Sequence, residues 1–307
     1  MGADAVWIDD FHHSMRVACT GRREAYCRDY LGTSQELLSC ALRSSLFQGQ
    51  WYAWQAQRRG NSMRGIPAAS AVFFLQNHDQ VANALRGTRL HALAGPALAR
   101  AVTTYFLLLA QTPLLFMGQE YFAPQPFLFF TDHEDALQRQ VDEGRAAFLA
   151  QLESAKEAIH QEGFQPPTGE AAFRASTLDR RQREAPEHAP AHLLHQTLLA
   201  LRRSDPLFRR QDRGQLEGAV LSPTALALRW PGSEAEGDRL LLLNLGVDLR
   251  DSPFPEPLLA APRGRTWRGL LSSEETRFGG SGAILPTGEG PWMIPGHCAL
   301  VLTSEPS

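Results

Sequence analysis

Three short apolar runs, each ending in polar residues, constrain the fold of this chain most strongly. They lie in residues 2–13, 73–81 and 113–120 of the 307-residue sequence. Strands that are apolar without alternation are buried on both faces, as in parallel sheets, and the roughly 65 and 40 residues between the runs can each hold a crossover helix. The runs therefore predict parallel strands of an α/β fold, with polar residues at their carboxyl ends.

The end of the second run, Asn77-His78-Asp79-Gln80, carries side chains that can bind a sugar. A carboxylate beside a histidine can hold a sugar diol and oppose positive charge on the ring, as cleavage of a glycosidic bond through an oxocarbenium-like state requires. The same residues are also typical of a turn followed by a helix cap. On the residues alone, both interpretations stay open.

Polar residues also follow the other two runs. Asp9, Asp10, Phe11 and His13 fit the wall of a glucan-binding cleft, with Phe11 as a stacking face, or a charge network that supports a loop. Adjacent residues at a strand end point in opposite directions, so these side chains do not converge on one ion and no metal is expected. Glu120, after the third run, either contacts sugar or braces the turn between strand and loop.

Several strings along the chain carry a family resemblance. They lie at residues 7–13, 20–21, 74–81, 113–121, 126–133, 144–145, 173–179 and 198–202. On these strings the chain resembles the C-terminal portion of the maltooligosyltrehalose trehalohydrolases, a family in the alpha-amylase clan of retaining glycoside hydrolases. The Asp-Asp-Phe-His-His and Phe-Phe-Thr-Asp-His strings are more specific than Asn-His-Asp, which the whole clan shares.

The resemblance implies an α/β chain in two domains. Residues 1–210 are expected to be the C-terminal part of a catalytic TIM (β/α)8 barrel with strands six to eight, because three strand-like runs do not close a barrel. Residues 211–307 are expected to form a C-terminal all-β sandwich domain. Helices are predicted at 34–48, 96–109 and 191–203, a polar surface excursion at 151–189, and short strands at 225–230, 240–245 and 297–302.

The resemblance also implies an activity. The complete enzyme would hydrolyse the alpha-1,4 bond next to a terminal trehalose in maltooligosyltrehalose, a step of trehalose biosynthesis that needs no cofactor. Asp79 would stabilise the transition state, while His78, Asn77 and Gln80 would bind substrate together with the cleft-wall residues Asp9, Asp10, Phe11, His13 and Glu120. Maltooligosyltrehalose or another alpha-glucan is the expected ligand.

In this family the nucleophilic aspartate and the acid/base glutamate lie at the ends of barrel strands four and five. The Gly-x-Arg-x-Asp pattern of the nucleophile has no copy here, because Gly144-Arg145-Ala146 and Gly264-Arg265-Thr266 lack the aspartate. We therefore expect a truncated glycosidase that is inactive alone. Its strands one to five would come from a separate N-terminal half-barrel chain as a partner or from coding sequence before Met1, and the sequence leaves both open. The alternatives are a fragment of a glycogen branching enzyme and a non-catalytic glucan-binding relic.

Composition and charge argue against nucleic-acid binding, a membrane span and secretion. The net charge is −3 and the arginines are scattered without a basic stripe, so nucleic acid is not an expected partner. The longest apolar stretch, residues 101–118, is broken by Thr103, Gln111 and Pro113 and does not suit a membrane span. Four cysteines without a Cys-x-x-Cys pair favour reduced thiols, and no signal peptide is visible, so we expect a cytoplasmic protein.

Overall fold

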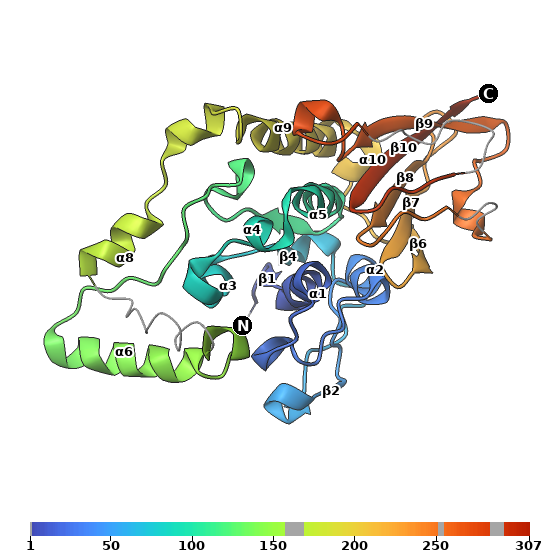
Figure 1. Cartoon of the computed structure of the whole chain (residues 1–307). Helices are drawn as coiled ribbons and strands as arrows, with labels where there is room; N and C mark the ends of the chain where they lie inside the picture. The colour runs from blue at the N-terminus through green and yellow to red at the C-terminus, as the bar shows by residue number, and fades with distance from the viewer. Residues whose placement is uncertain (1, 157–168, 251–254, 283–291) are drawn as a thin grey trace.

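Three parallel strands stand at the centre of the first part of the chain. The computed structural model describes residues 2–156, 169–250, 255–282 and 292–307. Strands β1 (Val6–Trp7), β4 (Ala71–Phe74) and β5 (Thr112–Leu114) pair in parallel in the order β1-β4-β5. Figure 1 shows β1 and β4 among the helices of this part. The parallel pairing predicted from the three apolar runs is thus confirmed.

Four main helices surround these strands, and three of them were predicted. They are α1 (Asp9–Thr20), α2 (Ser34–Arg43), α5 (Pro96–Leu108) and α9 (Ala189–Ser204). Helix α2 ends five residues earlier than predicted, because Ser44 adopts a left-handed conformation (φ 66°) and its N–H bonds back to the Cys40 carbonyl. Helix α5 begins with proline at its first turn, a position where the absent N–H costs no hydrogen bond.

Five further helices connect and flank this group in the described part of the chain. They are α3 (His78–Ala82), α4 (Leu90–Ala94), α6 (Asp135–Leu149), α8 (Gly169–Ser176) and α10 (Pro206–Arg209). The sequence analysis did not predict α6, which buries none of its residues and extends away from the strands together with α8 (Figure 1). The polar excursion predicted at 151–189 contains α8 and a short 3-10 helix, Arg180–Glu184, while residues 157–168 lie outside the described part.

The last third of the chain is a five-stranded antiparallel sheet. Its strands are β6 (Glu217–Ser222), β7 (Ala225–Trp230), β8 (Arg239–Asn244), β9 (Arg265–Ser272) and β10 (Cys298–Pro306), in the order β6-β7-β8-β10-β9. The all-β character is as predicted. A two-sheet sandwich is not, because the described residues of this region form one sheet only.

Helices, rather than a second sheet, cover one face of this sheet. Leu228, Leu241 and Val301 share a continuous core with Leu37 of α2 and Tyr105 of α5. The opposite face forms its own apolar cluster around Leu242, Leu300 and Trp267. Because both faces of β8 are buried, its residues Arg239–Asn244 carry an unbroken run of leucines.

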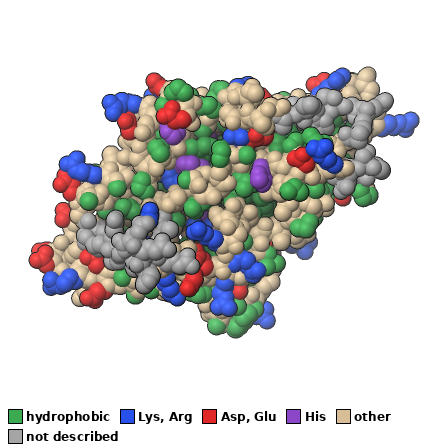
Figure 2. All heavy atoms as spheres, in the orientation of Figure 1, with side chains coloured by type: hydrophobic (Ala, Val, Ile, Leu, Met, Phe, Trp, Pro, Cys, Tyr) green, Lys and Arg blue, Asp and Glu red, His purple; other side chains and the backbone are tan. Residues whose placement is uncertain are grey.

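The surface is mixed in charge, and no described helix has the length and apolar character needed to cross a membrane. Acidic and basic side chains intermingle on the face drawn in Figure 2. A short hairpin, β2 (Trp51–Tyr52) with β3 (Gln57–Arg58), projects from the helical part. All four cysteines are free thiols.

Buried histidines should make the fold acid-labile. Burial lowers the pKa of His13 and of His91 to about 3, and that of His195 to about 4. The unfolded chain takes up protons near pH 6.5 and the folded chain does not, so stability should be full above about pH 6.5 and fall as pH drops toward 4. Each histidine contributes up to about 1.4 kcal/mol per pH unit in that window.

Urea unfolding at pH 7, 6 and 5 measures this loss. Replacing His13 by Gln should flatten the pH dependence of the unfolding free energy, whereas His133→Gln, at an exposed position, should leave it unchanged. Equal pH slopes in the wild type and in His13→Gln would show that His13 is protonated in the folded state as readily as in the unfolded state.

Candidate active site

The carboxyl end of β4 leads directly into helix α3. Asn77 is buried, has an extended backbone and caps the helix, since its Oδ1 accepts a hydrogen bond from the Gln80 N–H at 2.8 Å. The capping role therefore falls to Asn77 and not to Asp79. The short helix turns the two residues after the cap, His78 and Asp79, outward.

His78 and Asp79 form a polar pair at the surface. The imidazole Nε2 lies 3.6 Å from the Asp79 Oδ1, and about half of each side chain is exposed (48% and 54%). The Trp7 ring at the end of β1, itself 50% exposed, meets the His78 ring edge-on at 6.3 Å. An exposed carboxylate, an imidazole and an indole thus lie together at the carboxyl end of neighbouring parallel strands.

Arg145 of α6 contacts the C-terminal end of α3. Its guanidinium donates to the Asn83 Oδ1 and the Ala82 carbonyl at the end of that helix, and it lies 4.7 Å from the Phe129 ring centroid. Burial lowers the pKa of Arg145, and the negative charge of Asp79 acts in the opposite direction. A positive group therefore stands within electrostatic reach of the Asp79 carboxylate. The sequence analysis gave Arg145 no role.

Glu120 and Gln80 occupy less exposed places near the same strand ends. Glu120 is half-buried in a 3-10 turn, Gln119–Tyr121, which follows Gly118. Glycine is needed there, because φ is 82° and a Cβ would lie 2.8 Å from the Ala123 Cβ. The Gln80 Oε1 is buried and has no hydrogen-bond partner among the described residues.

The Asp-Asp-Phe-His-His string begins helix α1, directly after the end of β1. Phe11 is fully buried and stacks on Phe73 at 4.4 Å, so its ring has no exposed face for a sugar. His13 is also buried, against the rings of Tyr26 and Tyr30. The predicted stacking role of Phe11 therefore has no support in the structure.

Asp10 is the centre of a buried network. Its carboxylate accepts hydrogen bonds from the Tyr30 hydroxyl at 2.6 Å and from the N–H groups of Leu46 and Phe47 at 2.9 Å each. Asp9 reaches the surface and pairs with Arg59, which also approaches Asp10 at 3.5 Å. This matches the alternative interpretation, in which these acids support a loop.

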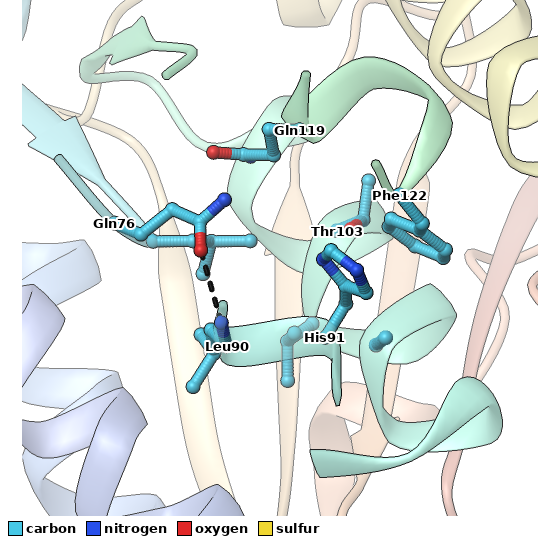
Figure 3. A pocket seen from close by; sticks show the side chains of 9 residues that line it. Gln76, Leu90, His91, Thr103, Gln119 and Phe122 are labelled. Carbon is cyan, nitrogen blue, oxygen red and sulfur yellow. Dashed lines mark hydrogen bonds between the residues drawn. The ribbon is translucent and has the colours of Figure 1, made fainter. Parts of the chain in front are cut away.

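A small pocket lies behind the strand ends, lined by residues that include Gln76, His91 and Gln119 (Figure 3). Its cavity volume of about 10 Å³ is room for one water at most. The Gln119 side-chain amide and the His91 Nδ1 have no partner within the described part of the chain. The pocket suits a buried water and is too small for a sugar.

Comparison with known proteins adds relatives for most of the chain, although no protein-family model matches it. A malto-oligosyltrehalose trehalohydrolase of Deinococcus radiodurans is 36% identical over 275 residues, which cover 85% of this chain and 44% of the relative. One of Arthrobacter ramosus is 33% identical over 213 residues, covering 67% of this chain and 35% of the relative. The chain thus spans less than half the length of these relatives.

A solved structure extends the similarity to nearly the whole chain. It is a protein of Salmonella typhimurium, described as a candidate alpha amylase, with a TM-score of 0.75 and 28% identity. The match covers 97% of this chain and 46% of that protein. The resemblance found in the sequence is thereby confirmed for part of the length of these proteins.

Proposed function

We propose that this chain, which these similarities place with the glycosidases of the alpha-amylase family, is the C-terminal part of a catalytic (β/α)8 barrel that releases trehalose from maltooligosyltrehalose. The observation that carries the proposal is the exposed His78–Asp79 pair at the carboxyl end of a central parallel strand. In barrels of this kind, residues at the carboxyl ends of the strands carry the chemistry.

The parallel sheet supports a barrel that continues beyond the described strands. Within the parallel sheet, the strands β1, β4 and β5 lie side by side in the order in which they follow one another along the chain, as barrel strands six, seven and eight would. Among the described residues, β1 and β5 each pair on one side only, and Val6 and Trp7 of β1 are half exposed. Strands one to five would then come from a further segment, on the same or on a separate polypeptide, and the greater length of the relatives fits this arrangement.

Within the complete site, Asp79 would bind substrate without attacking it. Its carboxylate would accept hydrogen bonds from two ring hydroxyls, and these bonds strengthen as the sugar ring flattens toward the transition state. His78 would bind a neighbouring hydroxyl, and the exposed Trp7 ring offers an apolar face for stacking. Arg145 would hold the end of α3 and thereby the position of Asp79.

Most of the remaining predicted site residues would position the site rather than bind the substrate. Asn77 fixes the start of α3, and Asp10 and His13 hold α1 in the core. Glu120 and Asp9 remain candidates for contacts at the rim. No step of this chemistry requires a cofactor, because hydrolysis by double displacement uses carboxylates and water.

The nucleophile and the general acid would be supplied by the segment that carries strands four and five. A glycogen branching enzyme would use the same strand end, so the products decide between the two activities. A glucan-binding relic would give no product at all.

The proposal is tested by product analysis of a reconstituted barrel. The chain is co-expressed with the N-terminal half of the Deinococcus radiodurans relative, and the purified complex is incubated with maltooligosyltrehalose and, separately, with amylose. We expect free trehalose from the first substrate and no alpha-1,6 branches in the second. Branch formation without trehalose release would favour the branching enzyme instead.

A further inference from the structure

A groove separate from the His78–Asp79 pair is lined in part by the segment that precedes β4. Helix α2 contributes Arg43 at its end, the segment before β4 contributes Ser62, Met63 and Arg64, and the connection to the C-terminal sheet contributes Arg213. Its cavity volume of about 510 Å³ is in the range of small-molecule sites. Nothing in the proposed glucan site uses these residues.

The groove is one-sided in charge. Three arginines line it, and no carboxylate lines it in the part of the chain that the structure describes. The guanidinium groups of Arg43 and Arg64 have neither an ion pair nor a hydrogen bond to any described residue. Their donors are therefore available to a ligand.

Arg213 is the anchored member of the three. Its Nη2 donates to the carbonyls of Met63 at 2.5 Å and Ile66 at 2.9 Å, and its Nη1 donates to the Ser44 hydroxyl. These bonds fix the guanidinium plane but supply no negative charge, and they leave two of its five N–H donors. Burial, and next the charge of Arg43, lower the pKa of Arg213. A cation that is partly desolvated beside another cation is stabilised by a bound anion.

We propose that this groove binds the phosphate group of a small molecule. Guanidinium groups match the oxygens of phosphate with paired N–H donors, and three of them around one groove can neutralise its double charge. The Ser62 hydroxyl, beside the apolar Met63, would meet a sugar attached to the phosphate. The expected ligand is inorganic phosphate or a phosphate monoester, which have the phosphate group in common.

Calorimetric titration of the full chain at constant ionic strength tests the proposal, with inorganic phosphate, glucose 6-phosphate and, as the reference anion, chloride. We expect binding of phosphate or of the sugar phosphate, and a loss of affinity of about tenfold or more in Arg43→Gln and in Arg64→Gln. Both side chains lack partners, so the melting temperature should not change. Arg22→Gln is the matched control, because Arg22 is exposed and is not among the residues that line the groove.

Comparison of inorganic phosphate with glucose 6-phosphate shows whether the groove recognises the phosphate group alone or a phosphorylated sugar. Tighter binding of glucose 6-phosphate supports a phosphorylated sugar, and equal binding supports recognition of the phosphate group alone. No heat beyond that of chloride, or equal loss of affinity in Arg22→Gln and Arg43→Gln, would overturn the proposal. Loss of phosphate binding on adding the N-terminal half would also overturn it, because the groove would then be covered by protein. None of these outcomes depends on glycosidase activity.

Discussion

On its own, the purified chain is expected to release no trehalose from maltooligosyltrehalose above the no-enzyme background. In a double displacement, the nucleophile forms the bond to the sugar while the acid protonates the leaving oxygen, so the two act as a unit. When such a unit is removed, little of the rate enhancement remains, whatever a stabilising carboxylate still contributes to binding. The expected loss is thus most of the several orders of magnitude by which enzymes accelerate such reactions.

Trehalose can be followed by chromatography over many hours at high protein concentration. The full-length Deinococcus radiodurans relative serves as the positive control, and the heated chain serves as the blank. Turnover by the chain alone that disappears in Asp79→Ala would contradict the account, since it would mean that all the catalytic carboxylates lie in the 307 residues.

In the reconstituted complex, Asp79→Asn should lower kcat for trehalose release by about 1,000-fold or more. Hydrogen bonds from the ring hydroxyls to a carboxylate strengthen in the transition state and supply several kcal/mol, and each 1.36 kcal/mol corresponds to about a factor of ten in rate. Asparagine keeps the size of the side chain but lacks the charge and one acceptor oxygen. The effect should fall mainly on kcat, because the interaction grows between the ground state and the transition state.

A matched variant separates this effect from a general loss of charge. Asp4 is exposed, so Asp4→Asn makes the same chemical change without touching the pair of His78 and Asp79. We expect Asp4→Asn to keep the wild-type rate and Glu120→Gln to lose less than Asp79→Asn. An unchanged kcat in Asp79→Asn, in a complex that assembles normally, would remove Asp79 from the catalytic machinery.

The fold could be predicted where the pattern along the chain is local. Unbroken apolar runs predicted β4 and its neighbouring strands. The spacing of apolar residues in helix α9 predicted its bounds to within two residues at each end. The described residues lack the second sheet of the expected sandwich, and the reason here is different. An unbroken apolar run such as that of β8 predicts that both faces of the strand are buried, but it does not predict which elements bury them. The helices that cover one face lie far away in sequence.

The Asp-Asp-Phe-His-His string shows how a motif can mislead about position. It was interpreted as the wall of a glucan-binding cleft or as a charge network that supports a loop, yet Asp9 and Asp10 stand in the first turn of α1, where negative charge is favoured by the helix dipole. That signal was present in the sequence. Burial of Phe11 and His13 follows from the helix, because residues that point inward from a helix at this place meet β4 and Tyr30.

The helix cap at the end of β4 was easier to predict than the fold of the Asp-Asp-Phe-His-His string, because a cap depends on residues that are close in sequence. The cap is made by Asn77, and the side chain of Asp79 faces solvent, so sugar binding by Asp79 stays a prediction. Arg145 could not be found in this way. It comes from α6, so only the folded chain brings it to the end of α3.

A titration of the N-terminal half into a fixed amount of this chain tests the central claim most directly, with light scattering and trehalose release recorded on the same samples. The account predicts that assembly and rate rise together from background and level off at one N-terminal half per chain. With Asp79→Asn, assembly should level off at the same ratio while the rate stays near background. Saturating assembly of the wild-type pair without trehalose release, or a rate that does not depend on this chain, would contradict the claim that its strands and Asp79 complete a catalytic barrel.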